Sequence, residues 1–189
     1  SRHLSATEIG KITWMEKTPD HAEHLPVIHR FYPAARVVFV IRDPEKAILS
    51  RRRHFSWNDE SSWPIERHAG RWLKTIRSAD EFKQQHPESI LYVRFEDVVN
   101  DKAQQISRIC DFLGVDFEPG QLFEQARFSR QQSLPWESWK ADAQTDVSGD
   151  IAAAANQLRL SPAEREVLDS QLLPYLIEYG YEATSGVAI

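Results

Sequence analysis

The chain has 189 residues, 41% of them hydrophobic and 27% charged, which fits a single domain over residues 1–189 and excludes collagen-like and disordered classes. Its formal net charge of −5 argues against general nucleic-acid binding, and its one cysteine, Cys110, excludes an intramolecular disulfide and a multi-cysteine zinc site. No apolar run approaches the roughly 20 residues of a membrane helix and residues 1–10 lack a signal-peptide profile, so we expect no membrane partner and a cytoplasmic location.

The first predicted element is a strand at residues 37–41, which reads Val-Val-Phe-Val-Ile. Its apolar residues do not alternate with polar ones, a pattern typical of a strand covered on both faces in a parallel sheet. Asp43 and Pro44 suit the N-cap and first position of a helix, which we predict from Pro44 to about Arg53. Basic residues at 51–54 indicate one site for an anionic ligand.

Apolar spacing predicts the next three elements. A helix is expected from about Pro64 to Lys83, because apolar residues recur there every three or four positions. A strand is expected over Ile90–Phe95, followed by a helix over 103–113 that Gly114 closes.

A capping box marks the start of the last helix. Ser161 and Glu164 form this box, and we expect Pro174 to kink or end the helix. The irregular stretch 118–160 is interpreted as a long functional loop or a poorly ordered flap. Strands alternating with helices predict an α/β fold with a mostly parallel sheet, in which ligands bind at the carboxyl ends of strands.

Arg42 lies at such a strand end. Ser50 follows Pro44 by six residues, about 9 Å along a helix, so both side chains can face one anion such as a phosphate. The alternative is that Arg42 pairs with a carboxylate and Ser50 is a surface hydroxyl.

Several sequence blocks resemble one enzyme family. The segment ARVVFVIRDPEKAILSR at 35–51 is similar to the 3'-phosphate-binding motif of sulfotransferases that use 3'-phosphoadenosine 5'-phosphosulfate (PAPS). Further blocks occur in the order typical of that family: WMEKTPDH at 14–21, FYPAAR at 31–36, WPIERHAGRW at 63–72, LYVRFEDVV at 91–99 and ICDFLGV at 109–115. The resemblance implies a P-loop-NTPase-like parallel sheet flanked by helices.

The resemblance also implies a nucleotide site. Arg42 and Ser50 would bind the 3'-phosphate, and Phe95 would pack near the adenine unless it is a core strand residue. Trp139 and Lys140 resemble a tryptophan–lysine pair with which some members close over the donor, although the spacing there is variable.

The implied reaction transfers a sulfuryl group from PAPS to a hydroxyl or amine of a carbohydrate, small-molecule or protein acceptor, without a metal. Lys17 would lie near the sulfuryl group, where its ammonium would stabilise charge developing on the leaving oxygen; the alternative is a surface lysine. Glu16 and His21 are equal candidates for the general base, and His24 is a third. His54 and His68 are interpreted as surface or structural.

The family's second nucleotide motif, a Ser-Gly-Thr phosphate loop after the first strand, does not occur in this sequence. We therefore expect a partial domain and a missing N-terminal segment or partner chain that adds a strand beside 37–41, since unpaired strand edges are costly. The alternative function is a non-catalytic nucleotide-binding or interaction module derived from such an enzyme. A nucleotide kinase would need a lysine-bearing Gly-rich loop, which is also absent from the sequence.

Overall fold

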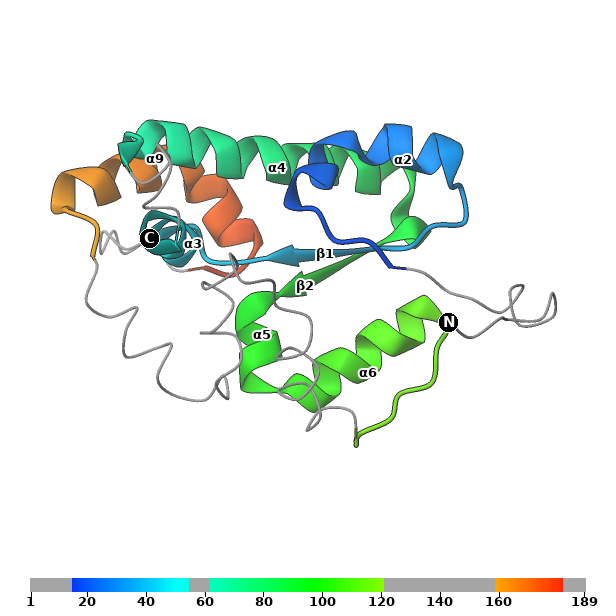
Figure 1. The fold of residues 1–189 in the computed structure, drawn as a ribbon. Coiled ribbons are helices and arrows are strands. Elements are labelled where there is room, and N and C mark those ends of the chain that lie inside the picture. Colours follow the sequence, from blue (N-terminus) through cyan, green and yellow to red (C-terminus); the bar gives the residue numbers. More distant parts are fainter. Residues whose placement is uncertain (1–14, 55–61, 121–158, 182–189) are drawn as a thin grey trace, which may run out of the picture.

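The computed structural model describes residues 15–54, 62–120 and 159–181 (Figure 1). In chain order its elements are η1 (Pro19–His24), α2 (Leu25–Phe31), β1 (Val37–Ile41), α3 (Pro44–His54), α4 (Ile65–Gln85), η3 (Pro87–Ser89), β2 (Ile90–Arg94), α5 (Phe95–Asn100), α6 (Lys102–Leu113) and α9 (Pro162–Glu178). The elements η1 and η3 are 3₁₀-helices. None of the helices in these ranges is long and apolar enough to cross a membrane.

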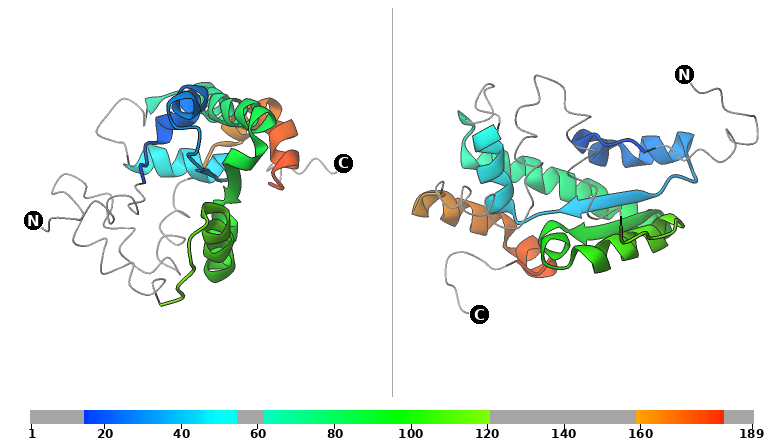
Figure 2. Two further views of the ribbon diagram at one scale, coloured as in Figure 1. Left: turned by 90° about the vertical axis from the view of Figure 1, so that its right-hand side faces the viewer. Right: turned by 60° about the horizontal axis from the view of Figure 1, so that its bottom comes forward.

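Two parallel strands form the centre of the fold. Val37 pairs with Ile90 and Ile41 with Arg94, so β1 and β2 end side by side. The helices α3 and α4 connect them, as a parallel pair requires. The helices α2, α4 and α9 lie on one side of the strands and α6 on the other (Figures 1 and 2). The predicted α/β architecture, a parallel sheet flanked by helices, is confirmed.

The core lies between α4, α9 and the sheet. One face of α4 is buried at three- and four-residue intervals, as expected for an amphipathic helix. It packs with the apolar face of α9 and with the buried side of β1. The buried residues of these three elements are Ile65, Ala69, Ile76, Ala79 and Phe82 of α4, Leu168, Leu172 and Leu176 of α9, and Phe39 and Ile41 of β1.

A shared carboxylate links three parts of this core. Asp80 of α4 accepts a hydrogen bond of 2.7 Å from the hydroxyl of Tyr92 and one of 2.5 Å from that of Tyr179. Burial, followed by the hydrogen bond to Asp80, raises the pKa of both phenols, so both remain neutral donors. The network fixes the end of α9 against β2 and α4.

Most predicted elements are confirmed within one or two residues. The strand at 37–41 is observed as predicted, and Gly114 ends α6 with a φ of +70°, a conformation that glycine adopts without strain. The Ser161–Glu164 capping box is present. The second strand ends at Arg94, so Phe95 is not a strand residue but the first residue of α5.

Pro174 does not end the last helix, which was one of the two outcomes expected from the sequence. The helix α9 continues through Pro174 to Glu178. A proline removes one backbone hydrogen bond, but Leu172 and Leu176 on either side are buried in the core. Burial of these leucines holds the last turn in place.

The surroundings of β1 among the described residues differ from the sequence expectation. Val40 is 54% exposed, so the prediction that both faces of the strand are covered is wrong for the described residues. Within residues 15–54, 62–120 and 159–181, β1 pairs only with β2. The additional strand that we expect beside β1 does not occur in these ranges.

The capping box of α9 predicts an acid-dependent contribution to stability. The hydrogen bond from the Ser161 backbone, aided by Arg52 at 2.7 Å, lowers the pKa of Glu164. A carboxylate with a lowered folded-state pKa stabilises the fold above its unfolded value of about 4.3, and this contribution is lost as the pH falls through the folded value. We expect Glu164→Gln to lower the free energy of urea unfolding at pH 7 and to have a smaller effect at pH 3.5. The exposed neighbour Glu166 is the control, and an E164Q deficit of equal size at both pH values would contradict this account.

Candidate functional site

The carboxyl ends of β1 and β2 bring together two residues that the sequence singled out. Arg42 follows β1 and Phe95 follows β2, and the strand register places them next to each other. The guanidinium carbon of Arg42 lies 4.5 Å from the centroid of the Phe95 ring. An aromatic ring beside an arginine at a strand end can bind a planar group and an anion together.

Arg42 keeps a free donor in this position. Burial lowers its pKa, while the nearby charges of Glu96 and Asp43 raise it. Glu96 instead accepts hydrogen bonds from the Asp43 backbone at 3.2 Å and from the Tyr181 hydroxyl at 3.1 Å. The Nε atom of Arg42 is buried without a hydrogen-bond partner, and within the described ranges no carboxylate forms an ion pair with this guanidinium. Arg42 is therefore suited to a ligand anion.

The surroundings of Arg42 fix its backbone. The indole Nε1 of Trp72 donates a hydrogen bond of 3.2 Å to the Arg42 carbonyl, which ties the end of β1 to α4. The Asp43 side chain accepts from the Lys46 amide at 3.1 Å and caps α3, as predicted. Ser50 is half-buried in α3, and the structure shows no contact between its hydroxyl and Arg42. The proposed pairing of Ser50 with Arg42 on one anion stays a prediction.

Glu16 and His21, two alternatives in the sequence, are direct partners in the structure. The Oε2 atom of Glu16 lies 2.6 Å from Nδ1 of His21, and the Thr18 hydroxyl donates to the other carboxylate oxygen at 2.6 Å. The chain turns at Pro19 into η1, where the His21 amide donates to the Thr18 carbonyl at 3.1 Å. This turn brings His21 back to Glu16. An imidazole held at Nδ1 by a carboxylate leaves Nε2 available to accept a proton.

Lys17 lies between these residues in the chain. Its side chain is exposed, and no ion pair holds it to a carboxylate within the part of the chain that the structure describes. Its ammonium is therefore available to a substrate, and its role near the sulfuryl group stays a prediction.

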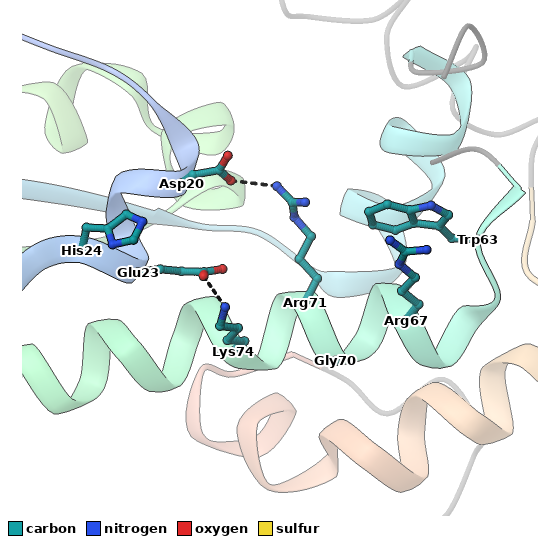
Figure 3. A pocket seen from close by; sticks show the side chains of 8 residues that line it. All are labelled: Asp20, Glu23, His24, Trp63, Arg67, Gly70, Arg71 and Lys74. Carbon is teal, nitrogen blue, oxygen red and sulfur yellow. Dashed lines mark hydrogen bonds and ion pairs between the residues drawn. The ribbon is translucent and has the colours of Figure 1, made fainter. Parts of the chain in front are cut away.

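A pocket of about 510 Å³ lies between η1 and α4 (Figure 3). Asp20, Glu23 and His24 of η1 line one side. The other side is formed by Trp63 and by residues of α4, namely Arg67, Gly70, Arg71 and Lys74. Two ion pairs cross the pocket, Arg71 to Asp20 at 2.7 Å and Lys74 to Glu23 at 2.5 Å.

The pocket-lining residues of α4 are not among the candidates predicted from the sequence. Their signal was the spacing of three basic residues at positions 67, 71 and 74, which places them on one helix face. A partner for that face could not be predicted, because the sequence does not reveal the 3₁₀-helix η1 opposite it. His68 of the same helix is 2% exposed and lies beside Trp63, which confirms its interpretation as structural.

The remaining candidates lie outside the described residues or at their edge. Trp139 and Lys140 belong to residues 121–158, which the structure does not describe. Most of the long loop predicted at 118–160 lies in the same range. Their assignment to the donor site stays a prediction.

Comparisons with known proteins agree on one family. A model described as "Sulfotransferase family" matches residues 3–119. Sulfotransferase 2A2 of Rattus norvegicus is 28% identical over 131 residues, which cover 59% of this chain and 44% of that protein. The solved structure "Sulfotransferase Domain from the Curacin Biosynthetic Pathway" has 21% sequence identity and a TM-score of 0.51, and the match covers 88% of this chain and 62% of that one. The chain thus spans less than two thirds of either protein, and the structural match confirms the fold expected from the sequence blocks.

Proposed function

This chain belongs to the sulfotransferase family, and we propose that it takes part in transfer of a sulfuryl group from PAPS to a hydroxyl or amine of an acceptor. The observation that carries the proposal is Arg42, a half-buried cation with an unpaired Nε beside an aromatic ring at the carboxyl end of β1. The sequence around it matches the family's 3'-phosphate motif, and its geometry supports the same assignment.

The donor site is proposed to use Arg42, Ser50 and Phe95. The guanidinium would supply paired N–H donors to the 3'-phosphate, and the start of α3 would add a favourable dipole. Phe95 would pack against the adenine without hydrogen-bonding it. Trp139 and Lys140 would complete this site from the late part of the chain.

The chemical step is proposed to use Lys17 and the Glu16–His21 pair. The acceptor oxygen forms a bond to sulfur while the bond from sulfur to the bridging oxygen breaks, and adenosine 3',5'-bisphosphate leaves. Lys17 would stabilise the negative charge that grows on the bridging oxygen. His21 Nε2 would take the acceptor proton, and Glu16 would orient the ring and stabilise the resulting imidazolium.

The two residues predict losses of different size. His21→Gln removes the base, so kcat is expected to fall about 100- to 10,000-fold. Glu16→Gln keeps the base and removes only the carboxylate that orients it, so kcat should fall by a smaller factor. Steady-state rates measure both effects, with His86→Gln at the far end of α4 as the histidine control. If E16Q lost more activity than H21Q, Glu16 would be the base and our assignment would be wrong.

We also propose that a strand from outside the described residues, or from a partner chain, pairs beside β1. The exposure of Val40 supports this, as does the fact that β1 pairs only with β2 among the described residues, because unpaired edge amides and exposed valine are both unfavourable. In the natural full-length protein, the β1 amides that do not bond to β2 should exchange with deuterium at least tenfold more slowly than those of Asp116 and Glu118, which are exposed beyond the end of α6. Equal exchange rates would refute the additional strand.

A further inference from the structure

Three cations of α4 occupy one face of the helix and meet η1 across the pocket described above (Figure 3). Arg71 and Lys74 each have a carboxylate of their own, Asp20 and Glu23 respectively. These two ion pairs link the walls of the pocket and neutralise four of its charges.

Arg67 is held differently. Its guanidinium carbon lies 3.6 Å from the centroid of the Trp63 ring, and within the described ranges no carboxylate forms an ion pair with it. The pocket therefore carries one positive charge more than its two carboxylates balance, in a chain whose formal net charge is −5. A local excess of positive charge on a protein that is negatively charged overall indicates an anionic ligand.

The stacking on Trp63 prepares Arg67 for a planar anion. A guanidinium lying over an aromatic ring keeps its in-plane N–H groups free, and these form a fork that matches both oxygens of a carboxylate. The indole and guanidinium planes also provide a flat surface for a ligand ring. A volume of about 510 Å³ is within the range of sites for small organic ligands.

The pocket shares an element with the proposed base. His21 belongs to η1, and its neighbours Asp20, Glu23 and His24 line the pocket. A ligand in the pocket would therefore lie against the same short helix that carries the group proposed to accept the acceptor proton.

We propose that this pocket is the acceptor subsite and that it takes a hydroxyl-bearing ring compound with a carboxylate, whose anionic group binds Arg67. The identification as an acceptor subsite rests on the proposed sulfuryl transfer, whereas the affinity for a ring carboxylate rests on the pocket itself. An acidic sugar has the required ring, hydroxyls and carboxylate.

The test compares two probes that differ in one group, 4-nitrophenyl β-D-glucuronide and 4-nitrophenyl β-D-glucoside. Ligand-observed NMR titrations of the full chain should give at least fivefold tighter binding of the glucuronide. Arg67→Gln should reduce its affinity to that of the glucoside. Arg77→Gln removes the same charge from the same helix, but Arg77 donates to the Tyr175 hydroxyl and does not line the pocket, so it should leave both affinities unchanged.

The outcomes separate this inference from the proposed function. Equal binding of the two probes, no binding of either, or equal losses in R67Q and R77Q would overturn the carboxylate site. Binding of adenosine 3',5'-bisphosphate is measured in the same samples, and R67Q should not change it. If that nucleotide fails to bind while the glucuronide preference and its loss in R67Q are observed, the sulfotransferase proposal fails and the carboxylate site stands. Transfer of sulfate to the glucuronide but not to the glucoside would support both.

Discussion

Replacing Lys17 with alanine is expected to lower turnover about tenfold to a thousandfold while changing the affinity for adenosine 3',5'-bisphosphate by less than about twofold. The charge that this ammonium would stabilise develops on the bridging oxygen mainly during transfer, so its loss should raise the barrier more than it weakens ground-state binding. The measurement pairs steady-state kinetics of the complete enzyme with calorimetry of the product nucleotide.

Lys83→Ala is the matched control for this variant. Lys83 is an exposed lysine at the far end of α4, where its ammonium lies 4.3 Å from the Tyr92 ring centroid. It should leave both quantities unchanged. If K17A lost affinity and rate by the same factor, Lys17 would be a ground-state phosphate ligand and not a group that acts in the chemical step.

Arg42→Ala is expected to weaken binding of adenosine 3',5'-bisphosphate about 30- to 150-fold. A hydrogen-bonded charged partner contributes about 2–3 kcal/mol, and each 1.4 kcal/mol corresponds to a factor of ten in affinity. Arg42→Lys should fall between the wild type and the alanine variant, because lysine keeps the charge but not the paired donors. Isothermal titration calorimetry gives all three affinities.

The control for Arg42 lies at the other end of the same strand. Arg36 precedes β1 and lies over the Phe112 ring, 5.5 Å from its centroid. Arg36→Ala should bind the nucleotide as the wild type does. Circular dichroism and a thermal unfolding curve confirm that each variant is folded. A loss of less than fivefold in folded R42A would remove Arg42 from the 3'-phosphate site.

The elements that the sequence predicted well are those with strong local signals. Such signals arise from residues close together in the sequence. Examples are the apolar run at 37–41, the buried stripe of α4 and the Ser161–Glu164 capping box. Short elements were missed, since the seven residues of α2 and the six of η1 are too few to establish a periodic pattern. The continuation of α9 beyond Pro174 could not be predicted from the sequence, because the burial of Leu172 and Leu176 depends on tertiary packing.

The geometry of the site depended on contacts that the sequence does not reveal. Arg42 and Phe95 could each be assigned to a strand end, but their 4.5 Å contact follows from the register of β1 and β2. Glu16 and His21 were weighed as alternatives because the segment was treated as extended. The turn at Pro19 makes them partners, and it also turns η1 toward the basic face of α4.

The most direct test of the central claim is a comparison of two nucleotides that differ only at the 3' position. Calorimetry should show that adenosine 3',5'-bisphosphate binds at least tenfold more tightly than adenosine 5'-monophosphate, and that Arg42→Gln abolishes this difference without changing the affinity for the monophosphate. Equal affinities of the wild-type protein for both nucleotides, or a preference that survives in R42Q, would contradict the assignment of a 3'-phosphate site at the end of β1 and the function proposed from it.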